Sequence, residues 1–174
     1  MDVLSVLPRF PILSALSPTE LQELAQVAEV RTAYKHGFIY LADEPSEYLC
    51  LLVQGTIKIG IYSPDGREII KSIQHPFTMF GELGLTGEGQ RAEFACAMNQ
   101  EVKYLVIRVA DFKRLLEQNF ALNQAVMLYL GERLRKAERQ WESLILKDVR
   151  TRIVESLKES ADKRGRQVGF ETLV

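Results

Sequence analysis

The sequence predicts a mainly β fold with flanking helices: an antiparallel β-roll of the jelly-roll type, followed by a long C-terminal helix. Two observations carry this prediction. The spacing of apolar residues changes from a helical period to the alternation of β-strands near Val30, and it returns to a helical period after Arg108. Between these points lie many short β-rich runs separated by turns, which is typical of a jelly-roll rather than a parallel sheet.

The first helix is expected to begin at Ser17. The Ser17 hydroxyl can accept a hydrogen bond from the amide three residues on, and the Glu20 carboxylate can reach back to the Ser17 amide, which is a capping box. Pro18 falls at the first helical position, where its missing N–H costs nothing. One apolar face then follows at helical spacing, formed by Leu21, Leu24, Ala25 and Ala28.

The β-rich runs are separated by turn residues, clearest at Gln54-Gly55 and at Ser63-Pro64-Asp65-Gly66, a strong hairpin turn. Cys50 and Cys96 lie within such runs. Two lone cysteines form neither a metal motif nor a disulfide framework, so we expect both to be buried core residues. The expected strands are Phe38–Leu41, Tyr48–Gln54, Thr56–Tyr62, Glu68–Ile73, Glu93–Met98 and Val102–Arg108.

After the strands, three helices are expected, at Ala110–Gln118, Leu122–Leu146 and Asp148–Ala161. The long middle helix carries apolar residues with a period of 3.5, the signature of a coiled-coil seam. An apolar stripe would also suit a helix packed on its own β-domain, but the charged flanks of this narrow stripe favour a homodimer. The expected dimer interface consists of Met127, Leu130, Leu134, Ala137, Trp141 and Leu144.

Composition narrows the function. The formal net charge of −1 provides no overall basic field for nucleic acid. No run approaches the roughly 20 apolar residues that span a bilayer, so we expect a cytoplasmic protein without a membrane partner. A cupin-type enzyme would need two or three histidines and a glutamate around a metal. The chain has only His36 and His75, far apart, and we expect no metal, no catalytic residue and no enzyme activity.

The most informative segment is Phe80-Gly81-Glu82-Leu83-Gly84-Leu85, followed by Gln90-Arg91-Ala92. Glycines allow a tight turn whose backbone amides can bind an anion. Arg91 adds a planar cation suited to phosphate, and Glu82 adds a carboxylate that can accept a ribose hydroxyl. Together these groups suit a nucleotide phosphoribose, although a Glu82–Arg91 salt bridge within a loop would use the same residues.

This segment resembles the phosphate-binding cassette of cyclic-nucleotide-binding domains. The similarity extends upstream to Tyr48–Gly55, Ile57–Ile61 and Asp65–Ile70, which resemble the central hairpins of that family. It extends downstream to Asp148–Ile153, which is similar to the first helix of the family's DNA-binding domain. On these motifs and their order, the chain is identified as a member of the Crp/Fnr family of bacterial transcription regulators.

The resemblance implies a role for each cassette residue. Next to Gly81, Glu82 would bind the ribose 2′-hydroxyl and Arg91 the cyclic phosphate, while the amides of Leu83 and Ala92 would complete the phosphate site. Arg133 on the long helix would be a second basic residue. The implied effector is cAMP or another cyclic nucleotide.

The base-recognition positions depart from the family pattern. Bacterial cAMP receptors have serine or threonine where this chain has Ala92, and hydroxyl residues where it has Ala137 and Glu138. The alternative is therefore a ligand-independent dimerisation or interaction module with a degenerate nucleotide pocket.

By the same resemblance, residues 1–120 would be the effector domain, 121–146 the dimerisation helix, and 147–174 the start of a truncated winged helix-turn-helix. We therefore expect a fragment of a longer regulator. That longer protein would bind DNA through the missing C-terminal domain, with RNA polymerase as a further candidate partner.

Overall fold

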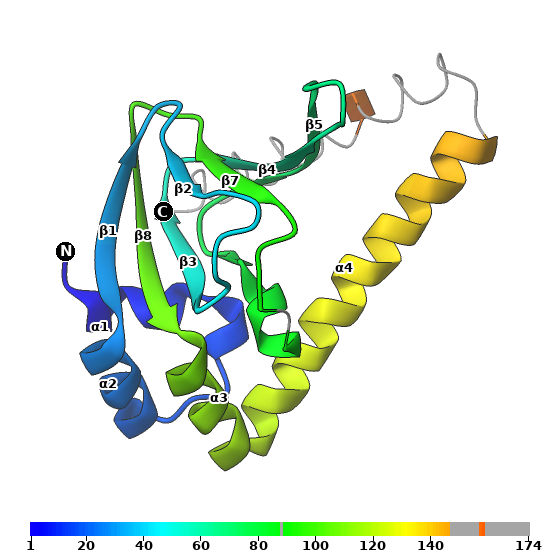
Figure 1. The fold of residues 1–174 in the computed structure, drawn as a ribbon. Helices are drawn as coiled ribbons and strands as arrows, with labels where there is room; N and C mark the ends of the chain where they lie inside the picture. The colour runs from blue at the N-terminus through cyan, green and yellow to red at the C-terminus, as the bar shows by residue number, and fades with distance from the viewer. Residues whose placement is uncertain (88, 147–156, 159–174) are drawn as a thin grey trace. The chain divides into compact units, whose positions relative to one another are not determined.

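The computed structural model describes residues 1–87, 89–146 and 157–158. The chain divides into two compact units, Met1–Met127 and Leu128–Val174. Within the described residues, the first unit contains two four-stranded sheets whose paired strands are all antiparallel, with helices gathered at one end of the strands (Figure 1). The predicted mainly β fold with flanking helices is confirmed.

The N-terminal helices begin with α1 (Val3–Val6), continue through two 3₁₀ turns, η1 (Leu7–Arg9) and η2 (Pro11–Leu13), and end with α2 (Pro18–Val27). The capping box predicted for α2 is present in full. The Glu20 amide donates to Ser17 Oγ at 3.3 Å, and the Ser17 amide donates to Glu20 Oε2 at 2.7 Å. The two reciprocal bonds fix where this helix starts.

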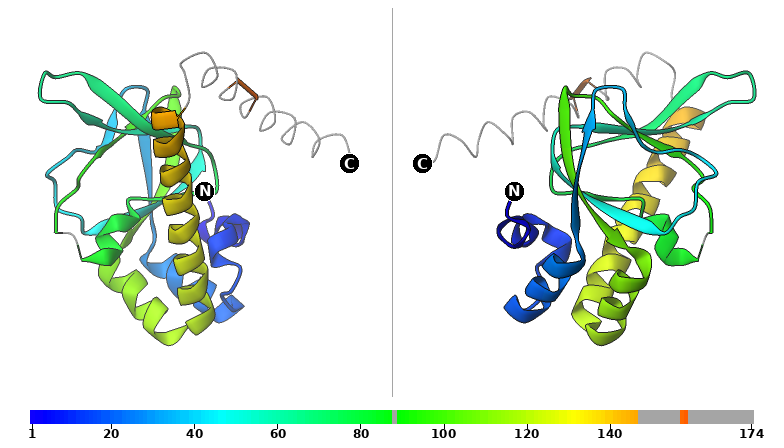
Figure 2. Two further views of the ribbon diagram at one scale, coloured as in Figure 1. Left: turned by 90° about the vertical axis from the view of Figure 1, so that its right-hand side faces the viewer. Right: turned by 60° about the vertical axis from the view of Figure 1, so that its left-hand side comes forward.

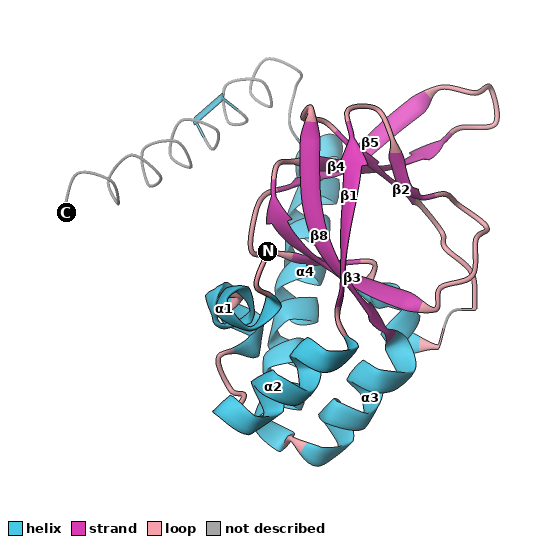
Figure 3. Ribbon diagram, turned by 90° about the vertical axis from the view of Figure 1, so that its left-hand side faces the viewer, coloured by secondary structure: helices cyan, strands magenta, loops and turns pink. Residues whose placement is uncertain are grey.

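The first sheet has the strand order β1-β8-β3-β6, and its strands β1, β8 and β3 are labelled in Figure 3. Its central strands, β8 and β3, each contain four consecutive buried residues and supply much of the core. The edge strands β1 and β6 were not predicted from the sequence. The bounds are β1 Glu29–Tyr34, β8 Glu101–Arg108, β3 Tyr48–Gln54 and β6 Met79–Phe80.

The second sheet has the order β2-β7-β4-β5. Strands β4 and β5 form the predicted hairpin, whose turn is closed by the Gly66 amide donating to the Ser63 carbonyl at 2.8 Å. The tip of this hairpin projects away from α1, α2 and α3 (Figure 2). The bounds are β2 Phe38–Tyr40, β7 Phe94–Ala97, β4 Ile57–Tyr62 and β5 Glu68–Gln74.

The core is an apolar cluster of residues from both sheets, among them Leu52, Ile59, Phe80 and Val106. Cys50 and Cys96 are both buried free thiols, as predicted. Burial raises the pKa of Cys50 to about 12, because the thiolate would lose its hydration.

Two helices follow β8: α3 (Val109–Gln118) and α4 (Phe120–Leu146). Asn119 joins them, because its Oδ1 accepts the Leu122 amide at 2.8 Å and its Nδ2 donates to Glu20 Oε1 at 2.8 Å. The part-buried side chain of Asn119 therefore links the start of α4 to α2. None of the described helices combines the length and apolarity that a bilayer crossing requires. The predicted helix Asp148–Ala161 lies outside the described residues apart from positions 157 and 158, as does the side chain of Leu144.

Candidate ligand-binding site

The glycine-rich segment leaves β6 through a left-handed residue. Gly81 has φ +70°, and the chain then forms the 3₁₀ turn η3 (Glu82–Thr86), which ends at Gly87 with φ +95°. A Cβ on Gly81 would lie 2.7 Å from Nη1 of Arg91 and 3.4 Å from a ring carbon of Tyr40. Backbone conformation and space both demand glycine here.

A second loop holds the arginine of the cassette in place. The Arg91 amide donates to the Glu44 carbonyl at 2.8 Å, and the Arg91 carbonyl accepts the Asp43 amide at 2.8 Å. The Ser46 amide donates to the Gly89 carbonyl at 3.1 Å. The backbone around Arg91 is thus paired with the segment between β2 and β3, and these bonds fix the position of the Arg91 backbone.

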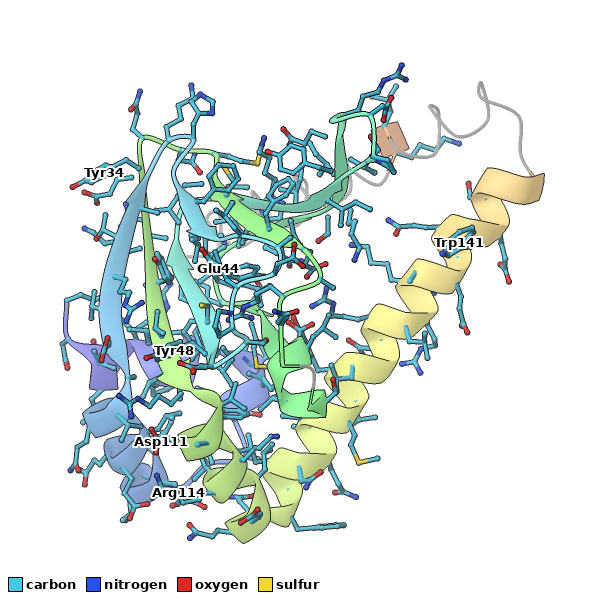
Figure 4. The ribbon with its side chains drawn as sticks, viewed as in Figure 1. Tyr34, Glu44, Tyr48, Asp111, Arg114 and Trp141 are labelled. Carbon is cyan, nitrogen blue, oxygen red and sulfur yellow. The ribbon has the colours of Figure 1, made fainter. Side chains whose placement is uncertain are left out.

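The Arg91 side chain runs into the interior, where the residue is only 7% exposed. Its Nη1 donates to the Gly81 carbonyl at 2.9 Å, and its Nη2 donates to the carbonyl of Tyr48, which is labelled with Glu44 in Figure 4. The guanidinium carbon lies 4.2 Å from the ring centroid of Tyr40. Nε is buried and has no hydrogen-bond partner.

The predicted cassette residues differ in their surroundings. Glu82 is almost fully buried, with 2% exposure, although its carboxylate is the group expected to bind a ribose. Leu83 is half-buried and Ala92 is exposed. The structure brings Gly81 and Arg91 into direct contact, and Glu82 follows Gly81 at the start of η3.

The contacts of Arg91 with Tyr40 and with the Tyr48 carbonyl were missed in the sequence. A backbone carbonyl has no sequence signature, since every residue supplies one. Tyr40 lies in a short strand far from the cassette motif in the sequence, and the pairing of β2 with β7, together with the bonds of the loop after β2 to Arg91, brings the two segments together. Within the described residues, no cluster of three or more histidine, cysteine, aspartate or glutamate side chains could hold a metal ion.

The predicted seam residues lie along α4, which extends into the second unit. Met127, Leu134 and Trp141 are 67%, 61% and 67% exposed, and Phe120, which the sequence interpretation missed, is 76% exposed. These four large apolar residues recur every seven positions on one helix, and Trp141 is labelled in Figure 4. Leu130 and Arg133 are half-buried, and Ala137 is exposed.

This arrangement defines a class of site. A buried guanidinium is directed at a glycine-rich turn within a two-sheet β-roll, its Nε has no hydrogen-bond partner, and such a site suits an anionic ligand. The model of the family described as "Cyclic nucleotide-binding domain" matches residues 30–119. The chain belongs to this family.

Similar proteins confirm the resemblance to Crp/Fnr regulators. The "CRP-like cAMP-activated global transcriptional regulator" of Mycobacterium tuberculosis is 26% identical over 164 residues, which is 94% of this chain and 73% of that protein. The "cAMP-activated global transcriptional regulator Vfr" of Pseudomonas aeruginosa is 31% identical over 137 residues, covering 77% of this chain and 64% of that protein. These relatives are transcription regulators.

A similar fold occurs among solved structures of transcription regulators. The sensor domain of the transcriptional regulator DNR from Pseudomonas aeruginosa superposes with a TM-score of 0.69 at 23% identity, covering 84% of this chain and all of that domain. At this identity the likeness establishes the fold alone.

Proposed function

We propose that this chain is the effector-sensing, dimeric regulatory part of a bacterial Crp/Fnr-type transcription factor, and that it binds a cyclic nucleotide at Gly81, Glu82, Leu83, Arg91 and Ala92. One observation carries the ligand proposal: Nε of the buried Arg91 has no hydrogen-bond partner. A buried donor without an acceptor costs about 1–3 kcal/mol, and a phosphate oxygen would remove that cost.

In this proposal each cassette group has a separate task. Arg91 donates to the cyclic phosphate, the amides of Leu83 and Ala92 add neutral donors, and the Glu82 carboxylate accepts the ribose 2′-hydroxyl. Arg133 is a second basic group. The names of the relatives make cAMP the first effector to test.

Calorimetric titration with cAMP and cGMP tests the ligand. We expect Arg91→Ala to weaken binding about 10- to 100-fold, since a charge-assisted hydrogen bond contributes about 1.5–3 kcal/mol. Glu82→Ala should cost less, because the bond it removes involves a neutral ribose hydroxyl. Arg67→Ala is the matched control, since Arg67 is an exposed arginine in the β4–β5 turn.

Equal affinity in wild type and Arg91→Ala would place the ligand elsewhere. No binding of either nucleotide to the wild-type chain at millimolar concentration would instead favour a ligand-independent interaction module.

The dimer proposal is supported by the exposed seven-residue repeat on α4. Large apolar side chains at this spacing suit a symmetric helix pair. We expect the double variant Leu134→Glu/Trp141→Glu to be monomeric by light scattering, because it places like charges in the seam. Tyr34→Glu changes an equally exposed residue on β1 and should leave the mass unchanged. An unchanged mass in the double variant would contradict the dimer.

The remaining parts of the proposal concern location, enzyme activity and DNA binding. We infer a cytoplasmic, non-enzymatic regulator whose DNA contacts, and any contact with RNA polymerase, lie C-terminal to the described residues. A gel shift against a random-sequence DNA library tests this. The 174-residue chain should select no sequence, whereas a longer protein should select a two-fold symmetric site with half-sites about one helical turn apart. Specific binding by the 174-residue chain would contradict the assignment.

A further inference from the structure

We propose that Tyr40 is a positioning residue for ligand binding: its ring holds the Arg91 guanidinium in the orientation in which Nε faces the bound anion. This inference rests on the proposed function, since it assigns Arg91 to the ligand. It adds a residue from β2, which is distant in the sequence from the glycine-rich segment and absent from its motif.

The first step is the contact itself. The guanidinium carbon of Arg91 lies 4.2 Å from the centroid of the Tyr40 ring, well within the range of a cation–π interaction. Both residues are buried, with Tyr40 exposed to only 6%. A desolvated cation–π contact is stronger than a surface one, because water no longer competes for the charge.

The second step is that the ring is itself packed in the core. Tyr40 stacks on Phe80 with a centroid separation of 6.2 Å and an interplanar angle of 26°, and Phe80 contacts Tyr104 at 6.3 Å. Phe80 is completely buried and directly precedes Gly81. The aromatic surface under the guanidinium is therefore part of the core rather than a mobile side chain.

The third step concerns the directions left open to the guanidinium. The carbonyls of Gly81 and Tyr48 accept Nη1 and Nη2, which limits rotation within the guanidinium plane. The Tyr40 ring limits tilting out of that plane. Of the three guanidinium nitrogens, Nε is the one without a hydrogen-bond partner, so the side chain is set for an anion before any ligand arrives, which lowers the ordering cost of binding.

Two substitutions separate this role from simple core packing. Tyr40→Phe keeps the aromatic face, whereas Tyr40→Leu keeps an apolar but smaller side chain without the π system. We expect Tyr40→Phe to bind cAMP or cGMP within about twofold of wild type. We expect Tyr40→Leu to bind about 3- to 30-fold more weakly, the range of a cation–π contact. Thermal unfolding of each variant measures the packing contribution separately.

A ligand-free measurement keeps the inference testable if neither nucleotide binds. In ¹H–¹⁵N spectra, the Arg91 Nε–H resonance, assigned by its loss in Arg91→Lys, should be shifted by the Tyr40 ring in wild type and in Tyr40→Phe. The shift should disappear in Tyr40→Leu.

Failure of the wild-type chain to bind cAMP and cGMP would overturn the proposed effector, whereas the spectra would still decide the position of Arg91. Equal affinity of Tyr40→Leu and wild type, or an unchanged Nε–H resonance in folded Tyr40→Leu, would overturn the role of Tyr40.

Discussion

The substitution Gly81→Ala tests how tightly the Arg91 guanidinium is held. Alanine at φ +70° carries a backbone cost of about 1–2 kcal/mol, partly offset by about 0.4–1 kcal/mol because alanine restricts the unfolded chain. The new Cβ would also lie 2.7 Å from Arg91 Nη1. The guanidinium must then give up its 2.9 Å bond to the Gly81 carbonyl, a charge-assisted bond of about 1.5–3 kcal/mol. The expected loss of unfolding free energy is about 2–4 kcal/mol.

Gly66→Ala is the matched control for this experiment. Gly66 has φ +80°, and a Cβ added there meets nothing within 4 Å, so alanine carries the backbone cost alone. Urea unfolding followed by circular dichroism gives both losses, and we expect about 1 kcal/mol for Gly66→Ala. Equal losses in the two variants would show that the guanidinium moves aside freely, and the argument for a tightly held arginine would fail.

Three further perturbations test other parts of the structure. Hydrogen bonds from the Ser17 backbone and the Asn119 side chain lower the pKa of Glu20, so the contribution of Glu20 to stability is full above the usual glutamate pKa of about 4.3 and is lost as the pH falls below it. Glu20→Gln should therefore weaken the pH dependence of the unfolding free energy in that acid range. An unchanged pH dependence would contradict this cause. Burial raises the pKa of both Cys50 and Cys96, so Ellman's reagent should label neither thiol in the native chain and both thiols in urea. Rapid labelling of the native chain would contradict this expectation. Lys71 Nζ lies 2.8 Å from the buried Glu93 carboxylate, and the Lys71 side chain is half exposed. Lys71→Met should lower the unfolding free energy measured in urea by about 1–2 kcal/mol. An unchanged unfolding free energy would mean that water replaces the amine as the partner of Glu93.

The elements that the sequence predicted correctly depend on neighbours a few residues away. The capping box needs only Ser17 and Glu20, and both of its bonds form. The β4–β5 turn needs only the four residues from Ser63 to Gly66, and it forms the expected hairpin. Local hydrogen bonds and left-handed glycines act within one turn, so residue identity alone indicates them.

Strand β1 was missed for the opposite reason. Only Ala33 of its six residues is buried, so its sequence lacks the alternation by which a half-buried strand is detected. What makes it a strand is pairing with β8, from Glu29 opposite Val106 to Tyr34 opposite Glu101. That pairing joins segments far apart in the chain, and edge strands of this kind are specified mainly by their partner.

The candidate site divides in the same way. Gly81, Glu82 and Arg91 were predicted because the motif keeps them within a short segment. The acceptor on β3 could not be predicted from the sequence, because the Tyr48 carbonyl lies 43 positions from Arg91 and any residue could supply a carbonyl. The sequence therefore predicted the side chain that we propose for the anion, but not the groups that contact it.

Arg91 contacts both sheets of the β-roll. The Tyr48 carbonyl belongs to β3 of the first sheet, whereas the Tyr40 ring belongs to β2 of the second. The Gly81 carbonyl, which follows β6, completes the set. A buried cation gains most from acceptors that are already in place, so the packing of the two sheets and the orientation of Arg91 depend on each other. For this reason a substitution that disturbs the groups around the Arg91 guanidinium, such as Gly81→Ala, should lower stability and ligand affinity together, whereas Gly66→Ala should lower stability alone.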